Sequence, residues 1–156
     1  MSLLGLLRRS RWSPRTATPH PSPPRTFRSH PRPDRPLVLV LQHEDEPFGA
    51  VDAALDILGC DGIWTHSTAE ACERLSAGPT PEVVVVDVSS SKPDVDFLVK
   101  HMSTGPEGTR VPLLLWGSHP EVMRTVEVPH VCWVRKPCRT PVLVGALESL
   151  GLGETR

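Results

Sequence analysis

From position 37 onward the chain contains five short runs rich in apolar and β-branched residues. Such runs, shorter than typical helices, predict strands, and the most apolar of them predict strands buried on both faces of a parallel sheet. The predicted strands are residues 37–41, 62–66, 81–87, 111–116 and 131–134. The run 62–66 is the least apolar, which predicts an edge position for that strand.

Between these runs, apolar residues recur every three or four positions, which predicts amphipathic helices. Three of the helices are defined by Val51, Ala54, Leu55 and Leu58, by Val95, Leu98, Val99 and Met102, and by Leu143, Ala146, Leu147 and Leu150. Five strands that alternate with five helices predict an α/β domain with a doubly wound, five-stranded parallel sheet.

Several residues mark the expected helix ends. Gly59 is expected to close the first helix. Segments 67–70 and 118–121 both have the Ser-x-x-Glu pattern of a capping box, in which a Ser hydroxyl and a Glu carboxylate satisfy each other's backbone donors. The helix that the second box opens should be short, because Pro129 blocks its extension. The Thr-Pro pair at 140–141 is predicted to cap the last helix.

Composition divides the chain into two parts. Residues 1–36 hold eight of the 18 Pro, eight Arg and a single acid, Asp34, whereas the later residues hold 9 basic and 17 acidic side chains. A segment with so few apolar residues and so many prolines cannot bury a core, so about 10–36 should be disordered. We therefore predict a Pro/Arg-rich extension over 1–36, a domain over 37–153 and a tail over 154–156.

The role of the extension is open to three interpretations. Residues 1–9 are apolar and end in two Arg, and the acid-free stretch after them has the composition of an organellar transit peptide. A dispensable linker, or a start assigned too far upstream, is equally compatible. Nucleic-acid binding through Arg has little support, since only Trp12 and Phe27 are interleaved aromatics. We therefore expect no nucleic acid as a direct partner. No stretch reaches the roughly 18 apolar residues of a membrane span, so we expect no membrane partner either.

Two polar residues follow buried strands. Asp87 ends the run Val83 to Val86, and Lys136 follows the last predicted strand, before Pro137. Ligands of open parallel sheets bind outside the carboxyl ends of the strands. An Asp and a Lys delivered to one sheet edge therefore predict a site that handles phosphate.

These residues resemble the response-regulator receiver domain of two-component signalling. The resemblance covers about residues 36–153 and is carried by the strand that ends in Asp87, by the Lys136-Pro137 pair and by the spacing between them. It implies a flavodoxin-like sheet of order 2-1-3-4-5 and a cis Lys-Pro bond. It also implies that Asp87 accepts a phosphoryl group from a phosphohistidine, and that Lys136 senses the phosphate.

The acidic pair that holds Mg²⁺ in receivers is not matched. In the ungapped register, which we favour, its positions fall on Gln42 and His43, with Glu44 next; a shift of two residues would place Glu44 and Asp45 there and shorten the first helix. The candidate metal ligands are therefore Asp87, Gln42, His43 and Glu44, and Mg²⁺ binding should be weak. His43 is also open to interpretation as a proton relay, as a neutral replacement for an acid, or as a solvent-facing side chain.

The receiver's Ser or Thr at the end of the fourth strand falls on Gly117. Ser118, one position further, is either a substitute phosphate sensor or only a helix N-cap. The aromatic switch position falls near Cys132 or Trp133. The expected phosphate-sensing residues are thus Lys136, Ser118 and Gly117.

The four cysteines show neither a Cys-x-x-Cys pair nor zinc-finger spacing. Two of them lie inside apolar segments, so reduced thiols in a reducing compartment, the cytoplasm, are expected. The loops contain no nucleotide or hydrolase motif, and we do not expect an enzyme.

Two functions are compatible with these features. One is a stand-alone signalling receiver, phosphorylated on Asp87 by a histidine kinase or phosphotransfer protein, that acts on a downstream protein partner. The alternative is a pseudo-receiver, an adaptor of the same fold that works without phosphorylation. Asp87 and Lys136 favour the first function, whereas Gln42, His43 and Gly117 favour the second.

Overall fold

A computed structural model describes residues 32–42, 49–88, 95–104, 111–118 and 130–153, and the structural statements below concern these residues. Within them lies one parallel sheet in the order β2-β1-β3-β4-β5, which confirms the predicted topology. The strands are β1 (Leu37–Leu41), β2 (Asp61–Thr65), β3 (Val83–Asp87), β4 (Leu113–Gly117) and β5 (Val131–Arg135).

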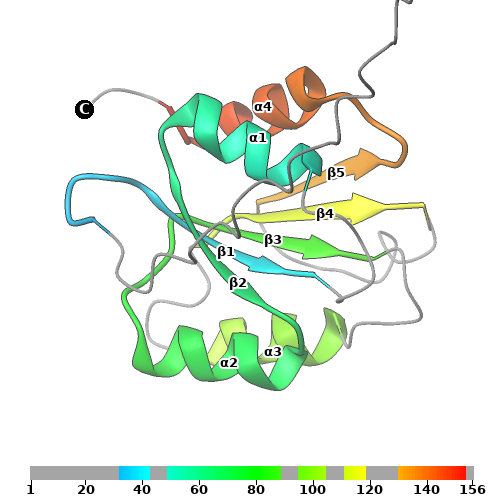
Figure 1. Ribbon diagram of the computed structural model, residues 1–156. Helices are drawn as coiled ribbons and strands as arrows, with labels where there is room; N and C mark the ends of the chain where they lie inside the picture. The colour runs from blue at the N-terminus through cyan, green and yellow to red at the C-terminus, as the bar shows by residue number, and fades with distance from the viewer. Residues whose placement is uncertain (1–31, 43–48, 89–94, 105–110, 119–129, 154–156) are drawn as a thin grey trace, which may run out of the picture.

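Helices cover both faces of the sheet (Figure 1). On one face lie α1 (Gly49–Leu58) and α4 (Thr140–Ser149), and on the other lie α2 (Thr68–Ala77) and α3 (Val95–Thr104). The helix predicted after Ser118 falls on residues 119–129, outside the described residues. Among the helices that are described, none combines the length and apolar character needed to cross a bilayer.

The alternation of side chains along the central strands builds two cores. Toward α1 and α4 point Val38, Val40, Val83, Val85, Leu114 and Trp116. Toward α2 and α3 point Leu39, Leu41, Val84, Val86, Leu113 and Leu115. Strands β1, β3 and β4 are buried along their whole length, as their apolar runs predict, while the edge strands β2 and β5 are mostly half-buried. Burying each such side chain contributes about 1.5–3 kcal/mol to the free energy of folding. The central strands are therefore held firmly in place, and Asp87 lies at the carboxyl end of one of them, β3.

The helix-end predictions hold for α1 and in part for α2. Gly59 follows α1 with a φ of 66°, the left-handed conformation that glycine adopts without strain. At α2 the Ser67 hydroxyl accepts a hydrogen bond from the Glu70 N–H at 3.1 Å, as the capping box predicts. The Glu70 carboxylate, however, accepts from the N–H of His66 at 3.0 Å and so ties the helix to the end of β2.

The predicted cap of the last helix is one residue too late. Thr140 is the first helical residue of α4, and Arg139, with φ −84° and ψ 152°, is the N-cap without a side-chain cap hydrogen bond. The reason is that the Val142 N–H donates to the Arg139 carbonyl at 2.9 Å, which closes the first turn ahead of Thr140. Pro141 is tolerated because a first-turn N–H needs no helical acceptor.

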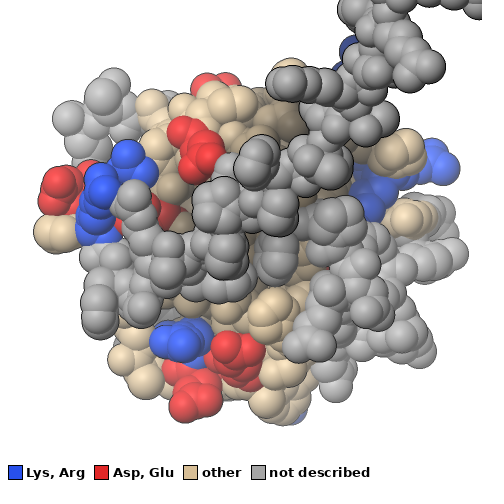
Figure 2. All heavy atoms as spheres, viewed as in Figure 1, with Lys and Arg blue, Asp and Glu red and all other residues tan. Residues whose placement is uncertain are grey.

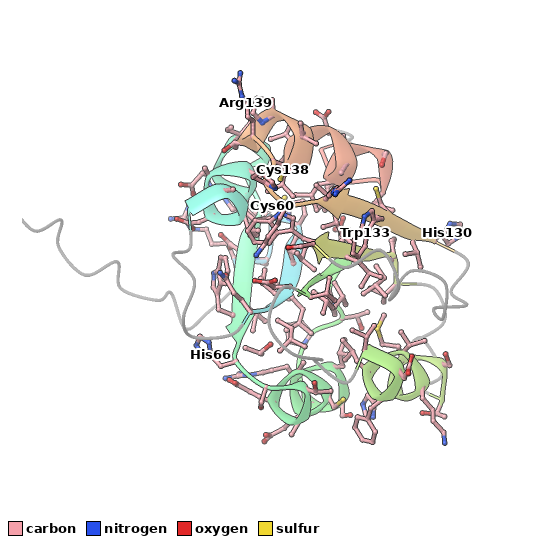
Figure 3. All side chains as sticks on the ribbon, turned by 90° about the vertical axis from the view of Figure 1, so that its right-hand side faces the viewer. Cys60, His66, His130, Trp133, Cys138 and Arg139 are labelled. Atoms are coloured by element: carbon pink, nitrogen blue, oxygen red, sulfur yellow. The ribbon has the colours of Figure 1, made fainter. Side chains whose placement is uncertain are left out.

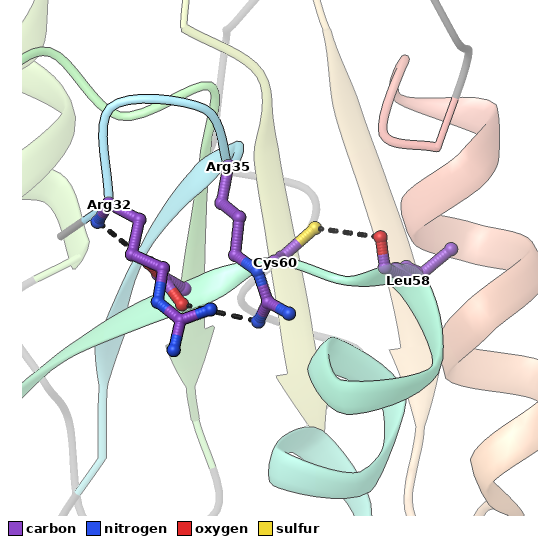
Figure 4. A network of polar contacts seen from close by, with 5 residues as sticks. Arg32, Arg35, Leu58 and Cys60 are labelled. Carbon is purple, nitrogen blue, oxygen red and sulfur yellow. Dashed lines mark hydrogen bonds and ion pairs between the residues drawn. The ribbon is translucent and has the colours of Figure 1, made fainter. Parts of the chain in front are cut away.

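The chain before β1 is attached to the amino edge of the sheet. The Arg32 N–H donates to Asp61 Oδ2 at 2.9 Å, and the Arg35 guanidinium lies 3.6 Å from Asp61 Oδ1 (Figure 4). The Asp61 N–H in turn donates to the Pro36 carbonyl at 2.9 Å. Figure 2 shows basic side chains next to acidic ones at its left edge, where this turn lies in Figure 1. Residues 32–36, which precede the predicted start of the domain by up to five positions, are therefore attached to the first residue of β2.

The four cysteines are free thiols. Burial raises the pKa of Cys60, the nearby carboxylates of Glu82 and Asp61 raise it further, and the Arg35 guanidinium lowers it. Burial also raises the pKa of Cys72. Both thiols are therefore held in their neutral, less nucleophilic form.

Candidate functional site

Asp87 is the last residue of β3 and is 2% exposed. Its position follows from the four valines before it, which bury β3 on both faces and carry the chain to the carboxyl edge of the sheet. In the alternation of β3, Asp87 continues the row of Val83 and Val85, which face α1 and α4. Its register partner on the neighbouring strand is Trp116 of β4. The carboxylate is thus built into the sheet edge rather than into a loop.

Lys136 reaches this carboxylate from the end of β5, across β4. Its Nζ donates to Asp87 Oδ2 at 3.0 Å, and the two side chains are 12% and 3% exposed. The Lys136 backbone N–H donates to the Gly117 carbonyl at 2.9 Å, which continues the β4–β5 ladder past Arg135. The following bond to Pro137 is cis, as the resemblance implies. The structure therefore brings together the two residues singled out from the sequence.

Trp116 is a part of the site that the sequence interpretation missed. The Lys136 Nζ lies 3.9 Å from the centroid of the Trp116 ring, a cation–π contact. The indole Nε1–H donates to Cys138 Sγ at 3.3 Å, so the ring is held from the segment after β5 as well. The signal was present in the sequence, because Trp116 directly precedes Gly117 at the end of a predicted strand.

The aromatic candidate on β5 belongs elsewhere. Trp133 is half-buried and packs on the core that faces α2 and α3, whereas Trp116 and Val134 belong to the core that faces α1 and α4. Figure 3 looks onto the carboxyl edge of the sheet and labels Trp133 on β5, and Cys138 beyond that strand. Cys132, the other candidate for the aromatic switch position, is also half-buried. The aromatic ring next to Lys136 is thus supplied by β4 and not by β5.

Gln42 lies at the end of β1, level with Asp87. The register pairs Leu41 with Val86, so the next positions on the two strands are Gln42 and Asp87. Gln42 is 1% exposed, its N–H donates to the Thr65 carbonyl at 2.9 Å, and its own carbonyl lies 3.1 Å from His66 Nδ1. A buried amide therefore occupies the strand end beside the carboxylate.

The other predicted metal ligands, His43 and Glu44, lie outside the described residues, as does Asp45. In the described part of the chain, no group of three or more His, Cys, Asp or Glu side chains could hold a metal ion. Among the described residues, this end of the sheet offers the Asp87 carboxylate, whose Oδ2 accepts a hydrogen bond from the Lys136 ammonium, and the neutral amide of Gln42. Mg²⁺ prefers several hard, charged oxygens in an octahedron. The described residues therefore do not fit a magnesium site by themselves.

Gly117 and Ser118 occupy the end of β4. Gly117 is buried and has no hydroxyl, and its carbonyl accepts the hydrogen bond from the Lys136 backbone. Ser118 is exposed, and the Glu121 of its predicted capping box lies outside the described residues. The end of β4 thus contacts Lys136 in two ways, through the backbone carbonyl of Gly117 and through the ring of Trp116.

The electrostatics of the site follow from its burial. A carboxylate and an ammonium that are both mostly removed from water attract each other strongly, and the loss of either one leaves a charge in a poorly solvated place. A carboxylate oxygen is also a nucleophile, and an adjacent cation stabilises negative charge that arrives with an electrophile. The arrangement is thus chemically suited to accept an anionic group on Asp87.

Comparisons with known proteins agree with this geometry at the level of the fold. No protein-family model matches the sequence. A search of curated proteins returns no significant match. Solved structures do match. A bacteriophytochrome response regulator superposes with a TM-score of 0.65 at 16% identity, over 78% of this chain and 81% of that one.

Two further matches have similar values. The chemotaxis response regulator CheY4 of Vibrio cholerae has a TM-score of 0.61 at 16% identity, over 74% of this chain and 98% of that one. The signal receiver domain of a signal transduction histidine kinase from Syntrophus aciditrophicus has a TM-score of 0.60 at 24% identity, over 78% and 95%. With its sheet order and the edge that carries Asp87, this chain has the fold of the response-regulator receiver domains.

Proposed function

We propose that this chain is a signalling receiver that accepts a phosphoryl group on Asp87 from a phosphohistidine of a histidine kinase or phosphotransfer protein. The single observation that supports it most is the Lys136 ammonium, 3.0 Å from the Asp87 carboxylate at the carboxyl edge of the sheet. The receiver fold of the solved relatives adds to it, since one of them is the receiver domain of a histidine kinase.

The proposed transfer is a displacement at phosphorus. An Asp87 carboxylate oxygen forms a bond to phosphorus, the phosphorus–nitrogen bond of the phosphohistidine breaks, and the imidazole nitrogen keeps that electron pair and takes up a proton. Lys136 offsets the negative charge that the phosphoryl group brings to a site already carrying a carboxylate. After the transfer Asp87 is an acyl phosphate, so the Lys136 ammonium faces phosphoryl oxygens in place of a carboxylate, and its contacts change with the modification.

The proposed output is a protein–protein contact. Phosphorylation would shift the domain between two pre-existing states and change the surface around β5 and α4, which a downstream partner reads. In this proposal the chain receives a signal and does not turn over a substrate, so it is not an enzyme. The free thiols support a reducing compartment, for which we propose the cytoplasm.

Small phosphodonors test the proposal without knowledge of the kinase. The full chain is incubated with acetyl phosphate and Mg²⁺, and its intact mass is measured before and after treatment with hydroxylamine, which cleaves acyl phosphates. We expect a gain of one phosphoryl unit that hydroxylamine removes and that Asp87→Asn abolishes. The matched control is Asp96→Asn, because Asp96 is an exposed acid in the first turn of α3. Equal phosphorylation of Asp87→Asn would overturn the assignment of the acceptor.

A phosphorylation-independent adaptor is the second candidate, and two observations favour it. A neutral amide, Gln42, lies level with Asp87, and Gly117 offers no hydroxyl at the end of β4. Both replace groups that the resemblance would place around a phosphoryl group. No mass gain at any Mg²⁺ concentration, together with a partner that binds wild type and Asp87→Asn equally, would support the adaptor over the receiver.

A further inference from the structure

We propose that Trp116 is a positioning residue for Lys136: its indole face holds the lysine ammonium beside Asp87 and releases it when Asp87 is phosphorylated. The inference rests on the proposed function, because the release step requires a phosphoryl group on Asp87. Trp116 does not touch phosphorus in this proposal and acts only through Lys136.

The Lys136 ammonium contacts a carboxylate and an aromatic face at the same time. Its Nζ lies 3.0 Å from Asp87 Oδ2 and 3.9 Å from the Trp116 ring centroid. Asp87 and Trp116 are register partners on adjacent strands, so the carboxylate and the ring stand side by side and a single cation can touch both. A cation within about 6 Å of an indole centroid is attracted by the ring quadrupole. The ring therefore adds a second attraction that keeps the ammonium close to Asp87.

The ring is the fixed member of this contact. Trp116 is 7% exposed and belongs to the core that faces α1 and α4. Its Nε1–H donates to Cys138 Sγ at 3.3 Å, which adds a polar restraint to the packing. Lys136, in contrast, carries its charge on a flexible four-carbon stem. When the charge at Asp87 changes, we therefore expect the ammonium to move and the ring to stay.

Phosphorylation supplies the force for that movement. A phosphoryl group carries a charge of about −1.5 to −2 near pH 7, and that charge lies on oxygens beyond the former carboxylate. A cation is attracted to a full negative charge more strongly than to a ring quadrupole. The ammonium should thus follow the phosphoryl oxygens off the indole face. Cys138 contributes indirectly, by holding the ring where Lys136 leaves it.

The alternative is that Trp116 only fills the core, and NMR of the lysine side chains separates the two. The chain has three lysines, Lys92, Lys100 and Lys136, so a spectrum of ¹³C-labelled lysine contains three Cε methylene signals. Protons above an indole face are shifted upfield by the ring current. In the full-length protein we expect the Lys136 signal, assigned by its loss in Lys136→Met, to lie upfield of the signal of exposed Lys100.

Three variants test the resting contact. Trp116→Leu should abolish the upfield shift, Trp116→Phe should rescue part of it because a ring face is kept, and Cys138→Ala should reduce it because the ring loses a restraint. An upfield shift that is absent in wild type, or that survives Trp116→Leu, would contradict the holding role. If Trp116→Leu does not fold, Trp116→Phe and Cys138→Ala decide by the same signal. A ring that only fills the core, with the ammonium away from its face, predicts that neither variant moves it.

Acetyl phosphate with Mg²⁺ then tests the release. We expect the Lys136 signal of wild type to move toward that of Lys100, while the Trp116 indole N–H signal stays in place. A gain in mass with an unmoved Lys136 signal would overturn the release but leave the proposed function intact. No gain in mass would contradict the proposed function, and the release with it, whereas the resting contact is still judged by the variants alone.

Discussion

The backbone N–H of Lys136 donates to the carbonyl of Gly117 at 2.9 Å, so the cation of the site is tied to the strand end that lacks a side chain. The bond does not depend on what side chain position 117 carries, because both partners are backbone groups. Gly117 also lies outside the set of described glycines with positive φ, so its backbone conformation is open to other residues.

We therefore predict that Gly117→Ser increases phosphorylation by acetyl phosphate, by a few-fold in initial rate. A hydroxyl at the end of β4, where the resemblance to receivers would place one, can donate to a phosphoryl oxygen, while the backbone bond to Lys136 is kept. Intact mass against time measures the rate, and Gly145→Ser, at an exposed glycine of α4, serves as the matched control. A rate for Gly117→Ser equal to that of wild type would mean that position 117 does not face the phosphoryl group.

Removing Lys136 should destabilise the protein. The Asp87 carboxylate is 3% exposed in its side chain, and Lys136→Met leaves it without this ammonium, which costs about 1–3 kcal/mol or more for a charged group. Urea denaturation measures the loss, and Lys100→Met, at an exposed position, should change stability by less than about 0.5 kcal/mol.

A double-mutant cycle gives the sharper result. Asp87→Asn combined with Lys136→Met should cost less than the sum of the two single changes, because each single change strands the partner charge. Additive costs would show that the 3.0 Å contact contributes little to folding.

Carboxylates at the end of β1 should strengthen Mg²⁺ binding. Gln42 lies level with buried Asp87, so Gln42→Asp with His43→Asp adds charged, hard oxygen ligands at this strand end. We expect the double variant to be less stable than wild type without Mg²⁺, because acids repel each other, and to gain more thermal stability than wild type as Mg²⁺ is added.

The control exchanges the neighbouring acids, Glu44→Gln with Asp45→Asn. If this control loses Mg²⁺ binding and Gln42→Asp with His43→Asp gains none, the register shifted by two residues is the correct one, and Glu44 and Asp45 are the ligands.

Truncation of the extension should separate its two parts. A chain that starts at Arg32 should be as stable as the full chain, since we predict that residues 1–31 bury no apolar surface. A chain that starts at Leu37 loses the ion pair and both hydrogen bonds to Asp61, those of the Arg32 N–H and the Pro36 carbonyl, and should lose about 0.5–2 kcal/mol. Thermal unfolding of both chains measures the difference. A large loss on removal of 1–31 would show that those residues pack on the domain.

The buried thiols should weaken the fold at alkaline pH. Burial, and then the carboxylates of Glu82 and Asp61, raise the pKa of Cys60 above its ordinary value of 9.0. Above that value the unfolded chain loses a proton that the folded chain keeps, so stability falls as pH rises. Urea denaturation between pH 8 and pH 10 should show this fall for wild type, and a smaller one for Cys60→Ala. A fall of the same size in both proteins would assign it to other groups.

Reaction rates offer a second measure of the same burial. At pH 8, Cys60 and Cys72 of the native protein should be alkylated more slowly than the half-buried Cys132 and Cys138. Mass spectrometry of digested, partly alkylated protein locates the modified residues.

The sheet order was predictable from the resemblance to receiver domains, and the meeting of Asp87 with Lys136 was predictable because it depends on strand ends. Four valines define where β3 ends, and parallel strands bring their carboxyl ends to one edge, so side chains at these ends meet whatever the loops do. The edge position of β2 was predictable from its low apolar content, because an edge strand is less buried than a central one.

The contacts of Trp116 were not predicted, since they depend on which face each strand residue occupies and on a side chain three residues after β5. The indole bonds Cys138, and its ring lies under Lys136; neither contact follows from an apolar run alone. The α4 cap was misplaced by one residue because a Thr-Pro pair is compatible with either the N-cap or the first turn. Which acids join Asp87 stays a prediction, since His43, Glu44 and Asp45 lie outside the described residues.

The attachment of Arg32 to Asp61 has a practical consequence for handling the protein. Asp61 opens β2 at the amino edge of the sheet, whereas Asp87 closes β3 at the carboxyl edge, so strands of five residues, about 15 Å long, separate the two points. A surface, dye or fusion partner that replaces the chain before Arg32 is thereby joined at the end of the sheet remote from the carboxylate. Immobilisation through that end should leave Asp87 and Lys136 open to a phosphodonor in solution.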